Sequence, residues 1–447
     1  MTTLRVVLES YAKHDAFNFH KEISSFIGYK KTKYQLIDEH TVPILDIKKK
    51  KNRPSHLPKD WLTSSFITLP KKANAKKCEK FRTIILMSQA KKLFLHINIH
   101  ERIRVKCDEQ LADSQFGFRS GVSTREALFA IQVLVQKCLD MQQDVFLCFI
   151  DYEKAFDRVL HDSLIAILQN IGLDGKDIRI ILNLYWNQRA TVRVDNEETA
   201  HIEIKRGVQQ GCILSPTLFN LYSETIIAET TKLMVISKNN FDDFNITVAD
   251  LKLERVRKYK YLGTWLNETW SSDQEIKTRI EMARSTFSKM KKVLCNRRLK
   301  ISLRTRLLRC YIWPIFLYGC EALTVKEDLR KRIEAFEMCA YRQMLGISWT
   351  RRITNVGVLR RVDQKRELRQ TVKMRKVAYL GHVLRHERYG LLKLIVMGKV
   401  AGKRGVGRRK KSWLCNIREW TGIASAVELF RLAKNRAEFT KLTANLR

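Results

Sequence analysis

One aspartate stands where a metal-dependent reaction could use it. Asp151 follows a six-residue apolar run at residues 145–150 and precedes a polar stretch that opens a helix. Such a run predicts a central strand, and α/β sheets bind ligands at the carboxyl ends of their strands. Aspartate is also a common helix cap, so Asp151 taken alone fits either a metal ligand or an N-cap.

In-line attack of a hydroxyl on a phosphate needs more than one acid. Two divalent cations about 3.5–4 Å apart must be bridged by carboxylates. Asp242 and Asp243 lie in an Asn-rich stretch that is typical of a polar loop, and Asp250 lies at the turn of a predicted surface hairpin. The sequence therefore predicts one strand-held carboxylate where at least two are required.

An aromatic residue and a glycine-containing loop accompany the acid. Phe156 is predicted on the helical turn after Asp151, where its ring could press against a nucleotide sugar or simply fill the core. Downstream, residues 191–195 and 201–204 alternate as a hairpin. The loop that follows contains Gly207 and Gly211, which let a backbone approach a phosphate or base pair closely, and it leads into a predicted helix.

The elements that position these residues change character along the chain. Short apolar runs alternate with helical stretches from residue 66 to about 266, which indicates an α+β body. Beyond it, Ser272 and Glu275 predict a capping box ahead of a helix with an apolar face from Ile276 to Leu294. Further helices are predicted at residues 303–313, stopped by Pro314, and at 329–344.

Composition limits the partners of the chain. Its 447 residues carry a formal net charge of +38, which favours a polyanion such as nucleic acid. Ten cysteines are scattered without paired spacing and predict reduced thiols, so a zinc site at His382 and His386 is the lesser alternative to a solvated helix face. No signal peptide or membrane-spanning run is apparent, which predicts an intracellular protein of the nucleus, the cytoplasm or both.

A basic segment lies near the end of the chain. Residues 398–411 combine glycines with seven basic residues, and this composition predicts a flexible tether that is too charged to pack. It would track phosphates or serve as a nuclear address, or it is a solvated linker. The basic residues that we assign to nucleic-acid binding are Lys403, Arg404, Arg408, Arg409, Lys410 and Lys411.

Six ordered blocks stand out along the chain: LPKK (69–72), KFRTI (80–84), QFGFRSGVST (115–124), FIDYEKAFDRVLH (149–161), RGVQQGCILSPTLFN (206–220) and YKYLGTWL (259–266). Together they resemble the reverse transcriptase of non-LTR retrotransposons, of the LINE-like, jockey type. The resemblance continues through LYGCEALT (317–324), MLGISWTRRITN (344–355), YLGHVLR (379–385) and KRGVGRRKKSWL (403–414).

This resemblance implies a right-hand polymerase fold of the α+β class. Residues 1–56 would form an N-terminal linker region and 57–266 the fingers and palm. Residues 267–350 would form a helical thumb, and 351–447 a basic helical C-terminal region. It also implies an RNA template, a DNA primer, and Mg²⁺ or Mn²⁺ as cofactor if the chain is active.

The resemblance assigns roles residue by residue. Asp151 and the Tyr152 carbonyl match the metal ligands, with Asp151 as the catalytic carboxylate, and Phe156 matches the aromatic residue that excludes the sugar hydroxyl. The remaining residues matched to nucleotide binding are Arg82, Gln210, Gly211 and Lys232.

The family's second acidic motif, a hairpin with an aromatic-Ala-Asp-Asp sequence, is missing. The chain passes directly from LYSETIIAE to TTKLMVISK, which indicates an internal deletion around residues 229–231 and a truncated palm sheet with Phe146 and Phe149 exposed. We therefore expect a reverse transcriptase relative that is impaired or inactive, or else a non-catalytic remnant that binds RNA or DNA. An endonuclease would have to come from another chain, since about 60 residues before the fingers are too few for one.

Overall fold

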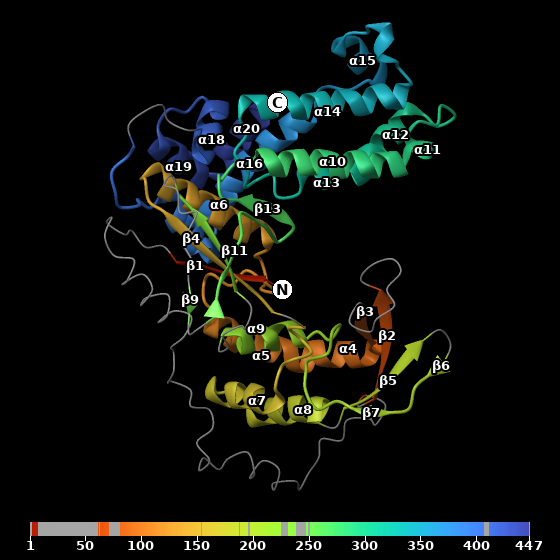
Figure 1. Ribbon diagram of the computed structural model, residues 1–447, viewed down its shortest axis with the longest axis vertical. Coiled ribbons are helices and arrows are strands. Elements are labelled where there is room, and N and C mark those ends of the chain that lie inside the picture. The colour runs from red at the N-terminus through yellow and green to blue at the C-terminus, as the bar shows by residue number, and fades with distance from the viewer. Residues whose placement is uncertain are drawn as a thin grey trace.

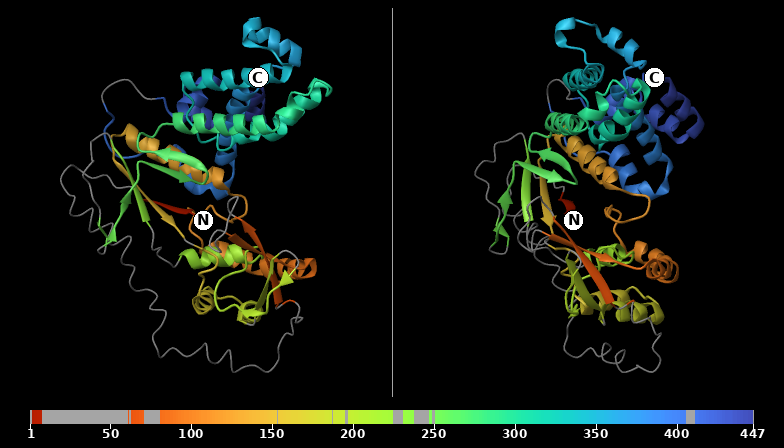
Figure 2. Two further views of the ribbon diagram at one scale, coloured as in Figure 1. Left: turned by 45° about the vertical axis from the view of Figure 1, so that its right-hand side comes forward. Right: turned by 90° about the vertical axis from the view of Figure 1, so that its right-hand side faces the viewer.

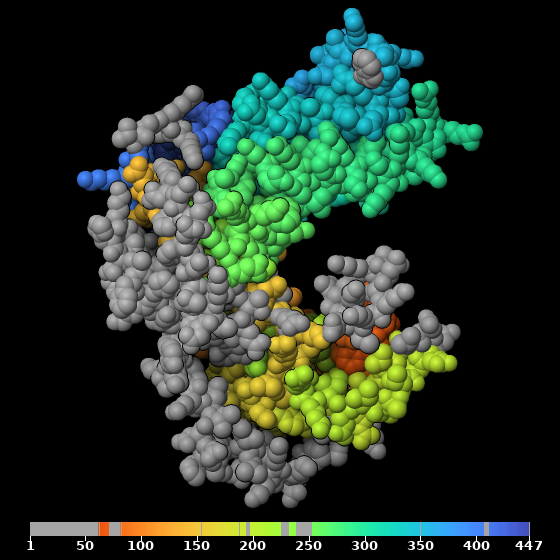
Figure 3. Space-filling view, in the orientation of Figure 1, coloured from red at the N-terminus to blue at the C-terminus, as the bar shows by residue number. Residues whose placement is uncertain are grey.

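The computed structural model describes residues 2–7, 61, 63–70, 81–152, 154–186, 188–194, 197–224, 231–237, 247–248, 251–405 and 411–446. They form a lower body and an upper body on either side of a central sheet (Figure 1). The space-filling view shows a hollow between the two bodies on the face that carries α10 (Asp273–Lys289) (Figure 3).

The central sheet has the strand order β1-β4-β8-β11. Its strands are β1 (Thr2–Val7), β4 (Val145–Asp151), β8 (Thr231–Ile236) and β11 (Glu254–Arg255). The β4 strand pairs antiparallel with both neighbours, and β11 runs parallel to β8. The apolar run at residues 145–150 is therefore a central strand, as its composition predicts.

The expected exposure of apolar palm surface at Phe149 is wrong. The Phe149 side chain is only 1% exposed, and its ring stacks on Tyr259 with 4.0 Å between the ring centroids. Phe146 on the other face of β4 is half-buried. The reason is that β1 and β8 pair along both edges of β4, while Tyr259 and α6 cover the face that carries Phe149.

The face of β4 that carries Phe149 is covered by α6 (Thr124–Asp140). This helix begins with a reciprocal capping box between Ser123 and Glu126. The other side of α6 receives helices from the end of the chain, and Phe129 meets both Tyr379 and Trp413 edge-on. These helices are α16 (Leu368–Arg385), α17 (Gly390–Met397), α18 (Trp413–Thr421), α19 (Ala426–Lys434) and α20 (Arg436–Asn445).

Two short hairpins lie beside the central sheet. The hairpin of β12 (Lys258–Tyr261) and β13 (Thr264–Asn267) turns at Leu262 and Gly263, both with positive φ, and adds Tyr261 and Leu266 to the core under α6. The predicted hairpin around Asp250 is confirmed in the antiparallel pairing of β9 (Thr247–Val248) and β10 (Leu251–Lys252). Asp242, Asp243 and Asp250 lie outside the described residues.

The lower body has its own sheet and core. Its sheet has the order β3-β2-β5-β6, with β7 also paired to β5, which confirms the predicted hairpin of residues 191–195 and 201–204. The strands are β2 (Thr63–Pro70), β3 (Phe81–Leu86), β5 (Arg189–Val194), β6 (Glu197–Glu198) and β7 (Ile202–Glu203). The helices are α4 (Gln89–Leu95), η2 (His96–His100), α5 (Glu101–Gln110), α7 (His161–Asn170), α8 (Gly175–Trp186) and α9 (Ser215–Glu224).

The part of the upper body that contains α10 is helical and forms a third core (Figure 2). The predicted helix at 329–344 is confirmed as α14 (Glu327–Leu345), and the apolar face from Ile276 to Leu294 is buried apart from the half-buried Met290. The other elements are α11 (Lys291–Leu294), α12 (Ile301–Leu307), η3 (Leu308–Ile312), α13 (Trp313–Leu317), η4 (Trp349–Arg351) and α15 (Asn355–Val362).

Two local predictions in this region are wrong. The helix does not stop at Pro314, because the π-helical turn η3 leads directly into α13, which carries this proline in its first turn, where an N–H is not needed. Ser272 and Glu275 make no capping box either. The Glu275 carboxylate instead accepts hydrogen bonds from the Trp265 backbone N–H at 2.7 Å and from Arg279 at 2.6 Å.

Among the described residues the cysteines are free thiols, as predicted, and five of the nine are buried. No helix in this part of the chain is long and apolar enough to cross a bilayer.

The described part of the basic segment packs, contrary to the prediction. Lys137 at the end of α6 donates to the carbonyls of Val396 and Gly398 at 2.7 and 2.8 Å, and Gln143 donates to Ala401 at 2.6 Å. The backbone of residues 398–405 thus runs along the α6 terminus because its carbonyl groups find donors there. The charged side chains of this segment, such as Lys403 and Arg404, remain exposed to solvent.

Candidate active site

Asp151 lies at the carboxyl end of β4 and its side chain is exposed. Its pairing partner in β1 is Thr2, and on the other side Ile150 pairs with Thr231 in β8. The sequences of these neighbouring strands, TTLRVV and TKLMVI, contain no acidic residue. Neither strand beside Asp151 therefore supplies a second carboxylate.

The described residues contain one group of three side chains able to hold a metal ion, and Asp151 is not in it. That group is His96, His100 and Glu101, at the junction of η2 and α5 in the lower body. Two cations in phosphoryl transfer need bridging carboxylates. The described residues around Asp151 thus do not fit a two-metal centre.

Aromatic rings form a wall next to Asp151. Phe156 is half-buried and stacks on Phe219 of α9 with centroids 5.0 Å apart, while Tyr152 meets Phe219 edge-on at 5.8 Å. The exposed Phe118 approaches the Phe156 ring edge-on at 6.0 Å. Ring packing thus fixes Phe156 on two sides. Its position fits both expected roles, that of a core residue and that of the wall of a site.

The glycine loop is bonded to the turn that follows Asp151. The Val208 N–H donates to the Phe156 carbonyl at 2.8 Å, and the Gly207 N–H donates to the Val159 carbonyl at 2.7 Å. Gly207 has φ +97°, and a Cβ there would lie 3.1 Å from the Asp157 backbone. Only glycine allows this approach, so the loop and the turn form one rigid unit.

His161 supports this unit from inside. Its Nε2 donates to the Gly207 carbonyl at 2.8 Å, and burial lowers the pKa of the imidazole, so that the neutral form is favoured. No pattern in the sequence indicates this role. His161 is the first residue of α7, which explains how that helix positions the loop.

The structure brings Gln210 and Gly211 to the same edge as β3. The Gln210 side chain donates to Asp157 Oδ1 at 3.3 Å, and its carbonyl accepts from the Ile85 N–H at 3.0 Å. Gly211 has φ +108°, and a Cβ there would lie 3.3 Å from the Ile85 carbonyl. The backbone of Arg82 lies on the same strand, paired with Leu69, so the loop and β3 are joined.

Asn220 was missed by sequence reasoning. This residue is 1% exposed; its amide donates to the Gly117 carbonyl at 2.8 Å and accepts from Gln115 at 3.0 Å. Two of the six ordered blocks, QFGFRSGVST and RGVQQGCILSPTLFN, are therefore hydrogen-bonded to each other. A polar residue on the apolar side of α9 was the available signal.

Lys232 lies on β8 of the central sheet. It pairs with Phe149 across the sheet, and its ammonium lies 3.2 Å from the carboxylate of Glu254. In the basic segment, Lys403 and Arg404 are exposed, and Lys411 forms an ion pair of 2.6 Å with Glu419. The other residues assigned there, Arg408, Arg409 and Lys410, lie outside the described residues.

Comparison with known proteins identifies the family of the chain. A family model described as reverse transcriptase (RNA-dependent DNA polymerase) matches residues 69–384. The chain is 28% identical to a probable RNA-directed DNA polymerase from transposon BS of Drosophila melanogaster, over 38% of this chain and 19% of the relative. It is 20% identical to the RNA-directed DNA polymerase from mobile element jockey of Drosophila funebris, over 54% and 33%.

A third relative is the retrovirus-related Pol polyprotein from type-1 retrotransposable element R2 of Popillia japonica, at 26% identity over 38% of this chain and 24% of the relative. The chain thus spans at most a third of these relatives' lengths. Reverse transcriptases bind a nucleic-acid template and primer and use divalent metal ions. Since the family model covers most of the sequence, from the lower body through α16, the chain belongs to the reverse transcriptase family.

Proposed function

We propose that the chain retains nucleic-acid binding of a non-LTR retrotransposon reverse transcriptase and synthesises DNA at a negligible rate or not at all. One observation carries the proposal: both strands hydrogen-bonded to β4 lack an acidic residue, so Asp151 has no carboxylate beside it on either strand. Two cations a few Å apart repel each other strongly unless several negative ligands compensate their charge.

Asp151 and the Tyr152 carbonyl would hold one divalent cation, Mg²⁺ or Mn²⁺. A single cation can orient a phosphate, but it does not activate the attacking hydroxyl and stabilise the leaving oxygen together. Phe156, Gln210 and Gly211 support binding of a nucleotide beside Asp151, since they line one rigid unit with it. Arg82 would contact the triphosphate, by its place on the adjoining β3.

The proposed layout follows the right-hand plan. Residues 57–266 would supply fingers and palm, with the lower body as fingers and the central sheet with α6 as palm. Residues 267–350 would supply the thumb, and 351–447 the basic C-terminal region. The hollow between α10 and the lower body supports this layout because it lies where a primer–template duplex would enter (Figure 3).

The proposed partners are an RNA template and a DNA primer. The net charge of +38 supports them, since neutralising phosphates releases counterions and contributes much of the binding free energy. Nicking of a target would require an endonuclease from another chain. We propose the nucleus, the cytoplasm or both as the location.

We further propose that the second acidic motif was lost by a deletion around residues 229–231. The continuous pairing of β8 with β4, from Ile236 opposite Val145 to Thr231 opposite Ile150, supports a rejoined sheet. Sequencing transcripts across residues 229–232 tests this point: reads that contain an intervening segment with paired acids would overturn it.

The function is tested by primer extension on an RNA template with Mg²⁺ or Mn²⁺. We expect duplex binding that weakens with salt and no incorporation by the wild-type chain. Asp151→Asn is the informative variant, and Asp363→Asn is its control. Asp363 is exposed, and its backbone is in the left-handed conformation, which asparagine also adopts readily. Incorporation that Asp151→Asn abolishes and Asp363→Asn preserves would establish a polymerase and refute the proposal.

A further inference from the structure

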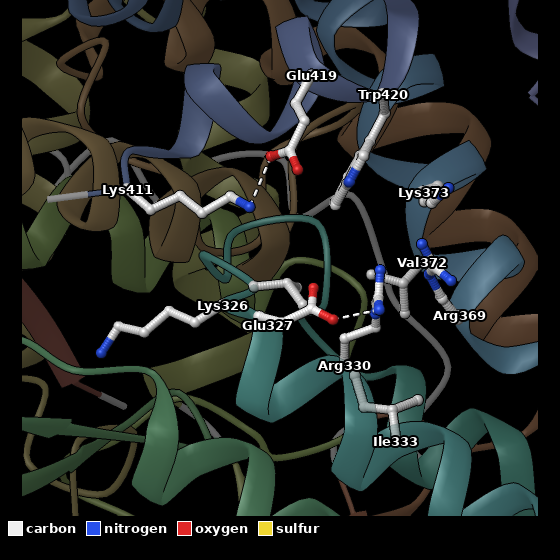
Figure 4. Close-up of a pocket in the computed structure, with 11 residues that line it drawn as sticks. Lys326, Glu327, Arg330, Ile333, Arg369, Val372, Lys373, Lys411, Glu419 and Trp420 are labelled. Atoms are coloured by element: carbon white, nitrogen blue, oxygen red, sulfur yellow. Dashed lines mark ion pairs between the residues drawn. The ribbon is translucent and has the colours of Figure 1, made fainter.

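A cavity of about 230 Å³ lies between the N-terminal ends of α14 and α16 and the C-terminal end of α18 (Figure 4). Of the residues described for the candidate active site, it contains only Lys411 and its ion-pair partner Glu419. Its lining residues are Val325, Lys326, Glu327, Arg330, Ile333, Arg369, Val372, Lys373, Lys411, Glu419 and Trp420.

The charges around this cavity do not balance. Five basic and two acidic side chains line it, a formal charge of 5 − 2 = +3, and Lys326 turns outward to Asp273 at 3.5 Å, outside the lining. Glu327 is paired with Arg330, and Glu419 with Lys411. Arg369 lies 3.1 Å from Glu334, which is outside the lining, and that carboxylate is shared with Arg330 and Arg366. The cavity therefore attracts an anion.

The pKa of Lys373 reflects the same excess of positive charge. Burial lowers the pKa of its ammonium, and the neighbouring Arg369 and Arg330 lower it further, since their charges repel it more than Glu419 and Glu334 attract it. In Figure 4 the side chains of Arg330, Arg369 and Lys373 converge on one side of the cavity. A phosphate accepting hydrogen bonds from these donors would relieve that repulsion.

The opposite side offers an aromatic surface. Trp420 is half-buried, with the Lys376 ammonium 5.1 Å from the centroid of its ring, and its indole points into the cavity in Figure 4, from the end of α18. The apolar side chains of Val325, Ile333 and Val372 complete the lining. An aromatic ring next to a cationic cluster is the combination that single-stranded nucleic-acid sites use, with a base stacked on the ring and a phosphate held by the cations.

The walls are held by buried polar contacts. Asn416 of α18 accepts from the Val325 N–H at 2.8 Å and donates to the Val325 carbonyl at 3.0 Å. Lys376 of α16 donates to Asn416 at 3.1 Å and to the Leu323 carbonyl at 2.7 Å. Asn416 and Lys376 are each 0% exposed. A site with fixed walls loses less entropy when it binds a ligand.

We propose that this cavity binds a phosphate of single-stranded nucleic acid, with the adjoining base stacked on Trp420. The proposal goes beyond the polymerase cleft and rests on the proposed nucleic-acid binding. In Figures 1 and 2, α14 lies on the side of α10 that faces away from the lower body, so the cavity is walled by helices outside the hollow. A strand bound there would be held in addition to a duplex at Asp151.

The test measures the fluorescence anisotropy of a labelled single-stranded RNA oligonucleotide with the full chain, across a range of salt. The double variant Arg369→Gln/Lys373→Gln removes two cations from the cavity. Arg332→Gln/Arg361→Gln is the matched control, since both arginines are exposed on α14 and α15 outside this lining and the change in charge is equal. Thermal unfolding verifies that both variants fold.

We expect the cavity variant to bind RNA about tenfold more weakly, and its salt slope to fall by about 0.7 for each phosphate that the variant no longer neutralises. The control should retain most of the affinity. Trp420→Leu should also weaken binding about tenfold, because the base then has no ring to stack on. Equal weakening by the cavity variant and its control would overturn the proposal, because it would show a general charge effect.

Further arms separate this proposal from the proposed function. Binding of a labelled single-stranded DNA shows whether the site requires RNA. Displacement of the labelled RNA by a low concentration of inorganic phosphate, or of a nucleoside triphosphate, would overturn the proposal that the site binds a polynucleotide. Binding of a primer–template duplex should be unchanged in the cavity variant. If the wild-type chain binds duplex but no single strand, only the cavity proposal fails; if it binds neither, the proposed function fails.

Discussion

Lys232 on β8 lies directly opposite Phe149 on β4, two residues before Asp151, and its ammonium is 3.2 Å from the Glu254 carboxylate on β11. Lys232, which the resemblance assigns to nucleotide binding, is thus paired within the sheet through both its backbone and its side chain. This ion pair joins β8 to β11, the parallel edge of the central sheet.

Lys232→Met should change the free energy of unfolding by less than about 1 kcal/mol, because the ion pair is partly exposed and surface pairs contribute little. Glu254→Gln should have the same small effect. Affinity for a deoxynucleoside triphosphate, followed by equilibrium binding, should be similar in both variants. A tenfold loss of affinity confined to Lys232→Met would instead give the lysine a direct role at the nucleotide.

Phe149→Ala should destabilise the protein by about 3–5 kcal/mol, since a ring that is 1% exposed is removed from the core under α6. Phe146→Ala, on the same strand but half-buried, is the control and should cost less. Urea unfolding and soluble yield measure both. Equal, small losses would indicate that β4 lies open to solvent, as the predicted loss of a hairpin implies.

Gly207→Ala should destabilise the loop and weaken nucleotide binding. A residue with a side chain is strained at φ +97°, and the new Cβ would meet the Asp157 backbone at 3.1 Å, at a cost of about 1–3 kcal/mol. Gly175→Ala is the matched control, because a Cβ at Gly175 meets nothing within 4 Å. Thermal unfolding compares them; an unchanged Gly207→Ala would contradict the rigid unit.

Lys376 should make stability increase with pH. Burial lowers its pKa from 10.5 to about 7, an effect that Lys411 strengthens and Cys320 opposes. Between these values the unfolded chain binds a proton that the folded chain does not, so the free energy of unfolding rises by up to about 1.4 kcal/mol per pH unit. Lys376→Met should remove this part of the slope between pH 7 and 10, whatever its constant effect on stability; a slope identical to wild type would contradict the prediction.

Glu337 should have the opposite dependence. Burial raises the pKa of this carboxyl from 4.5 to about 7, although the backbone N–H groups of Glu367 and Leu368 favour its charged form. The folded chain therefore holds a proton that the unfolded chain releases, and the stabilisation is present below pH 4.5 and lost as pH rises through 7. Glu337→Gln should flatten urea-derived stability across that window, and an Asp363→Asn control should not.

Local patterns predicted the elements whose partners are near in sequence. The face of α14 follows from apolar residues at helical spacing, and β4 from a continuous apolar run. The expected capping box is wrong because the Glu275 carboxylate accepts hydrogen bonds from Trp265 and Arg279 and does not bond to the backbone at the helix start. The expected stop at Pro314 is wrong because the π-helical turn η3 continues the helix up to this residue.

The candidate site was predictable in part for the same reason. Gly207 and Gly211 were identified by residue type, and their positive φ values explain that type. The contacts of His161 with Gly207 and of Asn220 with Gln115 join residues 46 and 105 positions apart, for which a single sequence carries no signal. The pairing of β1 with β4 was missed likewise, since its register depends on a strand more than a hundred residues away.

The sharing of one core by α6 and the last helices has a consequence for biosynthesis. Phe129 finds its partners Tyr379 and Trp413, 250 and 284 residues further along the chain, only after these have left the ribosome. Until then the outer side of α6 has nothing to cover it, and nascent chains are prone to aggregate at such surfaces. Folding of the central sheet must therefore wait for nearly the whole polypeptide, and chaperones that shield apolar helices should raise its yield.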